Sequence, residues 1–319
     1  MKKTLQIMAL LLICGLFLSA CDKKEKAFSP PKFNPLNIEL EEKLLENQPI
    51  KGFTGVSLYQ DKIYASDSTK NQVLCFNKDF VEQGKFGETG SRDGELLNPQ
   101  GIVADDSGIH VFDWGNKRIA RFDSNGKFIE NVAITEKIDS QTIVFGFAHK
   151  QGVYYISCSF ENFEPKVLIA EKGKETKALS SSGVGGFFDN NGVVHLLTRF
   201  VLRREAGQNI LSSPSGGEIY ELQDGQLKKV GQSYLGLTLS PFVRFGDDFV
   251  AFSSTLNDIE TFKTSNYELI GSMRLLKNLY PNWSSDKATK NIFLQSDGSR
   301  LYFIWPDEGF ISILSRKER

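Results

Sequence analysis

The chain has little of what metal clusters, disulfide frameworks and nucleic-acid sites are built from. Its 319 residues include four cysteines and three histidines, and its 38 lysines and arginines are offset by 39 aspartates and glutamates. Nucleic-acid binding needs a basic excess, which this balance excludes. The histidines form no close-spaced pair such as HxH or HxxxH, and neither a GxSxG elbow nor a Walker-type loop is present. We therefore expect no metal, no cofactor and no nucleic-acid partner.

The amino terminus carries the pattern of a bacterial lipoprotein leader. Met1-Lys2-Lys3 is basic, Leu5–Phe17 is apolar but too short to span a membrane, and Leu18-Ser19-Ala20-Cys21 resembles a lipoprotein cleavage box. The pattern predicts a signal peptide over residues 1–20 and a polar tether over residues 21–35, with Cys21 attached to membrane lipid. We expect anchoring in a bacterial cell envelope, at the periplasmic face of the inner or outer membrane or at the cell surface.

Beyond the tether, residues 98–134 read as four short strands separated by polar turns. Asp105-Asp106-Ser107-Gly108 has the composition of a tight turn. A meander of this kind cannot bury either face alone, so it must stack against copies of itself. A copy exists, because an offset of 46 residues lays Gly55 on Gly101 and Phe76 on Phe122 and keeps the hydrophobic class at most positions between. One four-stranded unit repeated at this period is typical of a β-propeller.

The same stretch carries a resemblance to a known repeat. Pro99-x-Gly101-Ile102, Gly108-Ile109-His110-Val111-x-Asp113-x-x-Asn116-x-Arg118-Ile119 and Phe122-Asp123-x-x-Gly126 resemble an NHL repeat. Together with its leader, the chain resembles the six-bladed propeller lipoproteins common in Gram-negative bacteria. The resemblance is strongest over Gly55–Ile134 and implies a fold rather than a function, because propellers of this type bind or cleave many unrelated molecules.

The rest of the chain has room for six such units. We predict an all-β, six-bladed β-propeller of four-stranded antiparallel blades over residues 36–319, with blades beginning near Phe53, Pro99, Thr142, Gly185, Pro241 and Asn291. The sixth unit is one strand short, which would leave an unpaired edge. We expect Leu36–Glu42 to pair with Phe310–Leu314 and close the ring. The alternative is a short helix, because Glu39–Glu46 is rich in good helix formers.

Two cysteines remain after processing, because Cys14 leaves with the leader and Cys21 takes lipid. Cys75 is expected on the third strand of the first blade and Cys158 on the second strand of the third blade. Non-adjacent blades hold them too far apart for a disulfide, so we predict two buried free thiols.

One face of a propeller carries the turns between second and third strands together with the inter-blade loops. We call it the loop-rich face and expect a ligand there, because loops on a rigid scaffold carry most binding sites. The segments Glu88–Asn98 and Thr198–Gly216 are its longest loops, and Thr198–Gly216 is long enough to act as a lid. The ligand-binding candidates on this face are Trp114, Lys117, Arg92, Arg199, Arg203 and Trp305.

Asp67 and Asp113 end the second strands of the first two blades. They could be carboxylates that converge on the channel mouth. Their recurrence at the same place favours a structural interpretation, in which each side chain caps the backbone N–H groups of the next turn.

Some enzymes share this fold, and the resemblance implies how they would bind a metal. Amidating lyases use histidines around the propeller axis, and propeller lactonases hold a divalent cation on inner strands. Here His110 and His195 are predicted on second strands, away from the channel, and His149 on a turn at the face opposite the loop-rich one. The inner strands, such as Gly101–Ala104, are apolar. The sequence therefore favours a lipid-anchored, non-catalytic propeller that binds an envelope protein, peptide or glycan. The alternative is a metal-dependent hydrolase or lyase of the lactonase or amidating-lyase type.

Overall fold

The computed structural model describes residues 40–138, 142–160, 164–205, 208–212, 217–233, 242–253, 258–272 and 292–316. The chain divides into two units, Met1–Pro31 and Lys32–Arg319, and every described residue belongs to the second. The predicted leader, Cys21 and the tether lie outside the described residues. No helix in the described part of the chain has the length and apolar character needed to cross a membrane.

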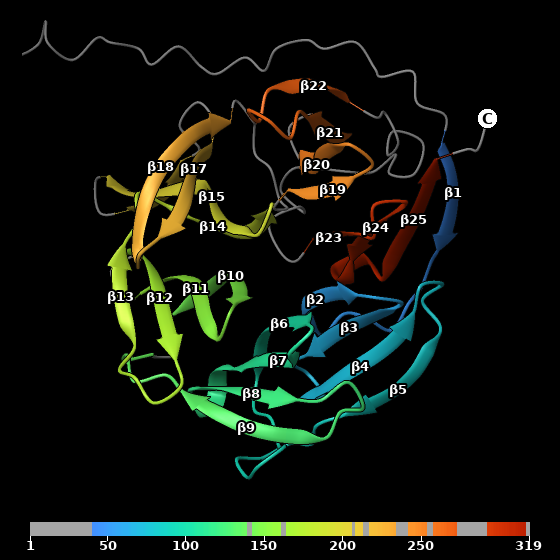
Figure 1. The fold of residues 1–319 in the computed structure, drawn as a ribbon. Coiled ribbons are helices and arrows are strands. Elements are labelled where there is room, and N and C mark those ends of the chain that lie inside the picture. Colours follow the sequence, from blue (N-terminus) through green and yellow to red (C-terminus); the bar gives the residue numbers. More distant parts are fainter. Residues whose placement is uncertain are drawn as a thin grey trace, which may run out of the picture. The chain divides into compact units, whose positions relative to one another are not determined.

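The described residues form six antiparallel sheets, which are arranged radially as the blades of a propeller (Figure 1). Blade 1 contains β2 (Phe53–Tyr59), β3 (Lys62–Asp67), β4 (Gln72–Asn77) and β5 (Glu82–Phe86). Blade 2 contains β6 (Pro99–Asp105), β7 (Gly108–Asp113), β8 (Arg118–Phe122) and β9 (Phe128–Ala133), with a short 3-10 turn, η1 (Trp114–Asn116), between β7 and β8. Blade 3 contains β10 (Ile143–Lys150), β11 (Val153–Ser159), β12 (Pro165–Glu171) and β13 (Lys177–Ser180).

The last three blades follow the same plan with local changes. Blade 4 contains β14 (Val184–Asn190), β15 (Val193–Glu205), β16 (Gln208–Ser212), β17 (Gly217–Gln223) and β18 (Gln226–Ser233). Blade 5 contains β19 (Val243–Phe245), β20 (Asp248–Ser253), β21 (Asp258–Phe262) and β22 (Leu269–Ser272). Blade 6 contains β23 (Phe293–Ser296), β24 (Arg300–Trp305), η3 (Pro306–Glu308) and β25 (Phe310–Arg316).

An amino-terminal strand completes blade 6, as the missing fourth strand predicted. The strand β1 (Leu40–Leu45) pairs antiparallel with β25, from Leu40 opposite Arg316 to Leu45 opposite Ile311. Figure 1 shows this blue strand beside the red end of the chain. The closing strand lies further along the chain than the predicted Leu36–Glu42, and residues 36–39 lie outside the described ones. The helical alternative for residues 39–46 is wrong for residues 40–45, because pairing with β25 satisfies a sheet edge that a helix would leave open.

The long insertion of blade 4 is a correction to the sequence prediction. Thr198–Gly216 was expected to be a lid loop, but β15 continues through Glu205 and pairs with β16, from Val201 opposite Ser212 to Glu205 opposite Gln208. Residues 206–207 and 213–216 lie outside the described ones. The extra residues therefore extend blade 4 as a β-hairpin, which satisfies backbone groups that a loop of this length would leave to water.

The inner strands of the first four blades contain a glycine at a recurring irregularity in the strand pairing. The register of the inner pair shifts just before Gly55, Gly101, Gly146 and Gly185. A Cβ added to Gly55 would lie 2.8 Å from the Ile102 backbone nitrogen, and one added to Gly146 would lie 2.8 Å from the Gly185 carbonyl oxygen. Neighbouring inner strands come too close here for a side chain, which explains why Gly55 and Gly101 match in the repeat.

Each pair of neighbouring blades encloses its own apolar core, which we call a seam and name by its two blades. Among the described residues, seam 2/3 buries ten apolar side chains, including Phe112, Ile156 and Leu168. The described part of seam 3/4 buries Val167, Phe187, Val194 and Leu196, with seven partly buried side chains around them. Cys75 and Cys158 are free thiols; the prediction of burial is confirmed for Cys158 and is wrong for Cys75, which is partly exposed. Burial raises the pKa of the Cys158 thiol to about 12, so this cysteine is a weak nucleophile.

Candidate functional site

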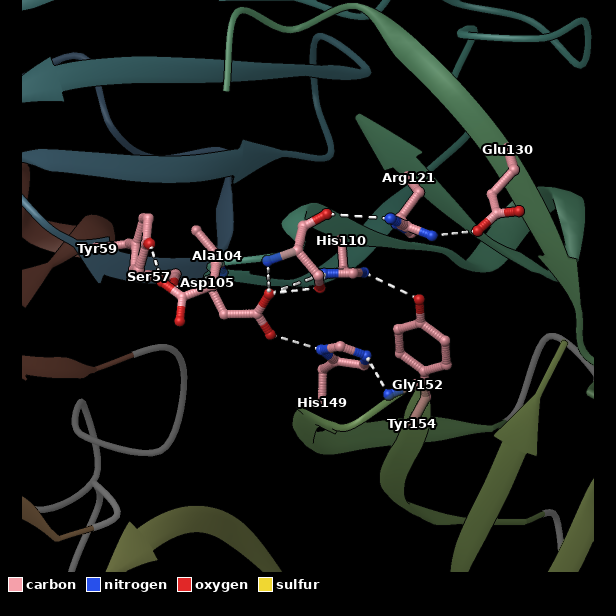
Figure 2. Close-up of polar contacts among 12 residues, drawn as sticks. Ser57, Tyr59, Ala104, Asp105, His110, Arg121, Glu130, His149, Gly152 and Tyr154 are labelled. Carbon is pink, nitrogen blue, oxygen red and sulfur yellow. Dashed lines mark hydrogen bonds and ion pairs between the residues drawn. The ribbon is translucent and has the colours of Figure 1, made fainter. Parts of the chain in front are cut away.

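Two histidines and an aspartate meet where blades 2 and 3 turn between their first and second strands. Asp105 ends β6, His110 lies near the start of β7 and His149 lies near the end of β10 (Figure 2). Their ligand-type atoms all lie within 4.8 Å of one another. This end of the molecule is opposite the loop-rich face, and we call it the short-turn face.

Asp105 accepts hydrogen bonds from three sides. The Ser107 backbone N–H lies 2.8 Å and the Ser107 hydroxyl 2.6 Å from Oδ1. His149 Nδ1 lies 2.5 Å from Oδ2. Burial alone would raise the pKa of Asp105, but the hydrogen bonds from His110, His149 and Ser107 outweigh it and hold the pKa well below its usual range. The carboxylate is therefore ionised.

The backbone fixes the tautomer of His149. The Gly152 N–H can only donate, and it points at His149 Nε2 at 3.1 Å. Nε2 must accept, so the neutral ring carries its proton on Nδ1 and donates it to Asp105. Both ring nitrogens of His149 are thus occupied, and its side chain is only 4 % exposed.

The same reasoning assigns the proton of His110. The Ser107 hydroxyl already donates to Asp105, so it accepts from His110 Nε2 at 3.0 Å, and the same Nε2–H lies 3.3 Å from Asp105 Oδ1. His110 Nδ1 then accepts from the Tyr154 hydroxyl at 2.9 Å. Burial lowers the pKa of His110 and raises that of Tyr154 to about 12, which keeps both groups neutral.

This network does not fit a metal centre. The His110 and His149 rings stack with centroids 4.1 Å apart and an interplanar angle of 25°. Imidazole lone pairs lie in the ring plane, so two stacked rings cannot both direct a lone pair at one ion. In addition, Gly152 occupies the His149 nitrogen that a bound metal would require to carry the proton. The cluster acts as a hydrogen-bonded clamp between blades 2 and 3.

A cleft lies beside this clamp on the short-turn face, at seam 3/4. Its volume is about 520 Å³. The lining comes from the β10–β11 turn of blade 3 and from two turns of blade 4, and consists of Lys150, Gln151, Val153, Tyr155, Gly192, Val193, Val194, Glu221, Leu222, Gln223 and Asp224. Lys150 crosses the seam to Asp189 at 2.9 Å.

The aspartates predicted to cap turns are both buried and hydrogen-bonded. Asp67 Oδ1 accepts from the backbone N–H groups of Thr69 and Lys70 at 2.9 and 3.0 Å. Asp113 accepts from the Leu97 N–H at 2.7 Å and from the side chains of Asn116 and Arg118 at 2.8 Å, and it makes no side-chain cap hydrogen bond to η1. It therefore joins the inter-blade loop to its own turn through side chains.

The loop Glu88–Asn98 is tied down by Arg118. The Arg118 guanidinium donates to the backbone carbonyls of Ser91, Arg92 and Glu95 at 2.7 to 3.0 Å. The exposed Arg92 side chain in turn donates to Glu95 at 2.7 Å. This loop is a compact, internally bonded element.

The remaining sequence-predicted ligand residues do not gather in one place. Trp305 is 2 % exposed and belongs to the core of seam 5/6, so a ligand cannot reach it. Trp114 is partly buried against seam 2/3, and Lys117 is exposed with φ 53° after η1. The side chains of Arg199 and Arg203 lie outside what the structure describes.

The clamp was not predicted from the sequence, because only metal ligands close together in the chain were considered. His110 and His149 lie 39 residues apart and come from different blades. The placement of His110 on a second strand was right, but this strand position faces the next blade. The repeat could have indicated a polar aromatic side chain at this position. The equivalent residues of the second strands in five blades are Tyr64, His110, Tyr155, His195 and Tyr302.

Six radial four-stranded blades with a strand from each chain end in the closing blade define a six-bladed β-propeller. The chain belongs to the family described as "DUF5128: 6-bladed beta-propeller", whose model matches residues 38–288. No curated protein matches the chain.

Several solved structures are similar. Virginiamycin B lyase from Staphylococcus aureus is 12% identical with a TM-score of 0.54, over 88% of this chain and 100% of that one. A putative gluconolactonase is 13% identical with a TM-score of 0.56, over 90% and 95%. The PQQ-bound aldose sugar dehydrogenase from Streptomyces coelicolor is 10% identical with a TM-score of 0.53, over 91% and 100%. At these identities the likeness concerns the fold alone.

Proposed function

We propose that this protein is a lipid-anchored, extracytoplasmic binding protein that holds a glycan, without catalysis, in the cleft at seam 3/4. The observation that carries the proposal is the lining of that cleft. Amide and carboxylate side chains from two of the three bordering turns line a space of about 520 Å³, together with one tyrosine. The proposal moves the ligand from the loop-rich face, where the sequence predicted it, to the short-turn face.

The chemistry of the lining favours a neutral, hydroxyl-rich ligand. Gln151 and Gln223 offer both donors and acceptors, Glu221 and Asp224 accept, and Lys150 donates. These side chains carry one positive and two negative charges, so they disfavour an anionic ligand. Protein partners use central aromatic anchors, and Tyr155 is the one aromatic residue among the described residues of this lining. A sugar chain matches such a surface better than a protein or a peptide does.

The lining does not support catalysis by a serine, cysteine or histidine nucleophile. As far as it is described, it contains no histidine, cysteine or serine, and the nitrogens of the neighbouring His149 are both hydrogen-bonded. An activated nucleophile needs a base within hydrogen-bond reach.

Calorimetric titration of the purified protein with neutral hexasaccharides of glucose and of N-acetylglucosamine tests the proposal. We expect saturable binding of at least one of them, weakened tenfold or more by Gln223→Ala, with Arg92→Ala on the loop-rich face as the unaffected control. Failure of every sugar probe, with binding of peptides instead, would contradict the glycan assignment. Cleavage of the sugar during the titration, or a stoichiometric divalent ion in elemental analysis, would favour the hydrolase or lyase alternative.

The anchor is tested separately. Processing at the predicted cleavage box makes Cys21 the lipidated first residue, and multiple acyl chains give stable membrane attachment. Cys21→Ala should therefore move the protein from the membrane fraction to the soluble extract. Retention of this variant in the membrane fraction would contradict lipid anchoring.

A further inference from the structure

We infer that His149 is a positioning residue for the proposed glycan cleft, because its ring holds the turn that forms one wall of the cleft. The effect of His149 on sugar affinity rests on the proposed function, whereas its effect on the turn follows from the hydrogen bonds alone.

The cleft is bounded by three two-residue turns of the same kind. Both central residues of each turn have positive φ: Gln151 and Gly152 at 49° and 81°, Asn191 and Gly192 at 51° and 79°, and Asp224 and Gly225 at 48° and 72°. Turns of this type I′ geometry favour Asn-Gly and Asp-Gly, because Asn and Asp tolerate the left-handed region. Two of the three turns have these sequences. Gln151-Gly152 does not, so its turn needs support from outside.

His149 supplies that support. Its Nε2 accepts the Gly152 N–H at 3.1 Å, while its Nδ1–H donates to Asp105 at 2.5 Å. The ring thus links the turn of blade 3 to the ionised carboxylate of blade 2. The side chains of Gln151, Lys150 and Val153 on and beside this turn line the cleft.

Removal of the His149 ring removes the acceptor. The Gly152 N–H then loses its partner on the ring, and the link from the turn to the Asp105 carboxylate is lost with it. Gln151, which neighbours Gly152 in the turn, is then no longer held in place as a wall of the cleft.

The groups that face His149 hold its ring in this orientation. Asp105 at the end of β6 accepts from Nδ1, and His110 from β7 stacks on the ring. Tyr154 from β11 contacts the ring with its centroid 4.6 Å away. Other charged groups nearby are paired with each other: Lys150 with Asp189 across seam 3/4, and Arg121 with Glu130 within blade 2.

Amide exchange measured by NMR tests the turn without any ligand. The Gly152 amide should be protected from exchange at pH 7.5 in the wild-type protein. His149→Ala should lower this protection at least tenfold. His149→Gln should restore it, because a glutamine amide can donate to Asp105 and accept from Gly152. His195→Gln is the matched control and should keep the wild-type protection.

Several outcomes would overturn the inference. One is an unchanged Gly152 protection in His149→Ala, and another is the same loss in His149→Gln. If the variants do not fold, the ¹⁵N shifts of the wild-type His149 ring decide the question, because a proton on Nε2 at pH 7.5 contradicts the proposed support. Sugar titration of His149→Ala beside the wild-type protein separates the two proposals. Equal sugar affinity contradicts the positioning by His149 and leaves the binding function standing, whereas no sugar binding beside a loss of Gly152 protection in His149→Ala contradicts the function and leaves the support of the turn standing.

Discussion

Seams 2/3 and 3/4 share blade 3 but end differently on the short-turn face. At seam 2/3 the last residue of β6, Asp105, meets His149 of the next blade, and His110 meets Tyr154. The equivalent residues at seam 3/4 are Lys150 with Asp189 and Tyr155 with Val194. Lys150 and Asp189 form an ion pair at 2.9 Å, with the carboxylate on the later blade instead of the earlier one. Tyr155 and Val194 cannot form the hydrogen bond that joins His110 to Tyr154, because the valine side chain has no polar group.

The difference shows how one repeat makes both a closed and an open seam. Tyr154 closes seam 2/3 with a buried hydroxyl, whereas Val194 leaves Tyr155 to line a cleft. Where the structure describes its side chains, seam 3/4 also buries fewer apolar residues than seam 2/3. We therefore expect the binding site at seam 3/4, where valine replaces the tyrosine that closes seam 2/3.

The largest expected effect compares matched leucines in the two cores. Leu168 in seam 2/3 and Leu196 in seam 3/4 are both fully buried. Changing either to alanine should cost about 2 to 5 kcal/mol of unfolding free energy, from lost burial and the cavity left behind. Leu168→Ala should cost more, because its neighbours are more completely buried. Urea unfolding of both variants measures this, and a larger loss for Leu196→Ala would contradict the difference in packing.

A smaller effect should come from the hydroxyl that closes seam 2/3. Tyr154→Phe leaves His110 Nδ1 buried without its donor, and should cost about 1 to 3 kcal/mol. Tyr155→Phe is the control and should cost less than about 0.5 kcal/mol, because Tyr155 lines the cleft. Equal losses in thermal or urea unfolding would show that the two seams are closed alike.

Acid should weaken the seams that contain buried histidines. Burial lowers the pKa of His110 and of His195, so below about pH 6.5 the unfolded chain binds protons that the folded one does not. Stability should then fall as the pH falls, by up to about 1.4 kcal/mol per pH unit for each histidine. The depressed pKa of Asp105 adds stability above about pH 4 that is lost at lower pH. Urea unfolding at pH 8, 6 and 5 checks the slope, and a pH-independent stability over this range would contradict the buried neutral histidines.

The smallest stability effect should come from the ion pair at seam 3/4. Lys150 and Asp189 are partly exposed, so Lys150→Ala should cost less than about 1 kcal/mol. Sugar affinity should fall several-fold in the same variant, because Lys150 lines the cleft. A large loss of stability without a loss of sugar affinity would show that Lys150 joins the blades structurally, as Asp105 does, and does not contact the ligand.

The repeat made the fold predictable from sequence, but it did not predict the site. Recurring glycines, tight turns and alternating apolar residues gave the blade boundaries and the closure by an amino-terminal strand. The segment Thr198–Gly216 was wrongly predicted to be a loop, because the two strands that pair with each other both lie within it. Trp305 failed as a ligand residue because a strand end in a propeller faces the neighbouring core. The meeting of His110 with His149 depends on contact between blades, which no spacing along the chain encodes.

The most direct test of this account is the location of bound sugar. In ¹H–¹⁵N NMR spectra of the purified protein, we titrate the hexasaccharide that binds most tightly and map the shifted amides. The account predicts that the shifts concentrate on the turns at Gln151–Gly152, Asn191–Gly192 and Asp224–Gly225, which border the cleft. Shifts that concentrate instead on the loop-rich face, around Arg92 and Trp114, would contradict it.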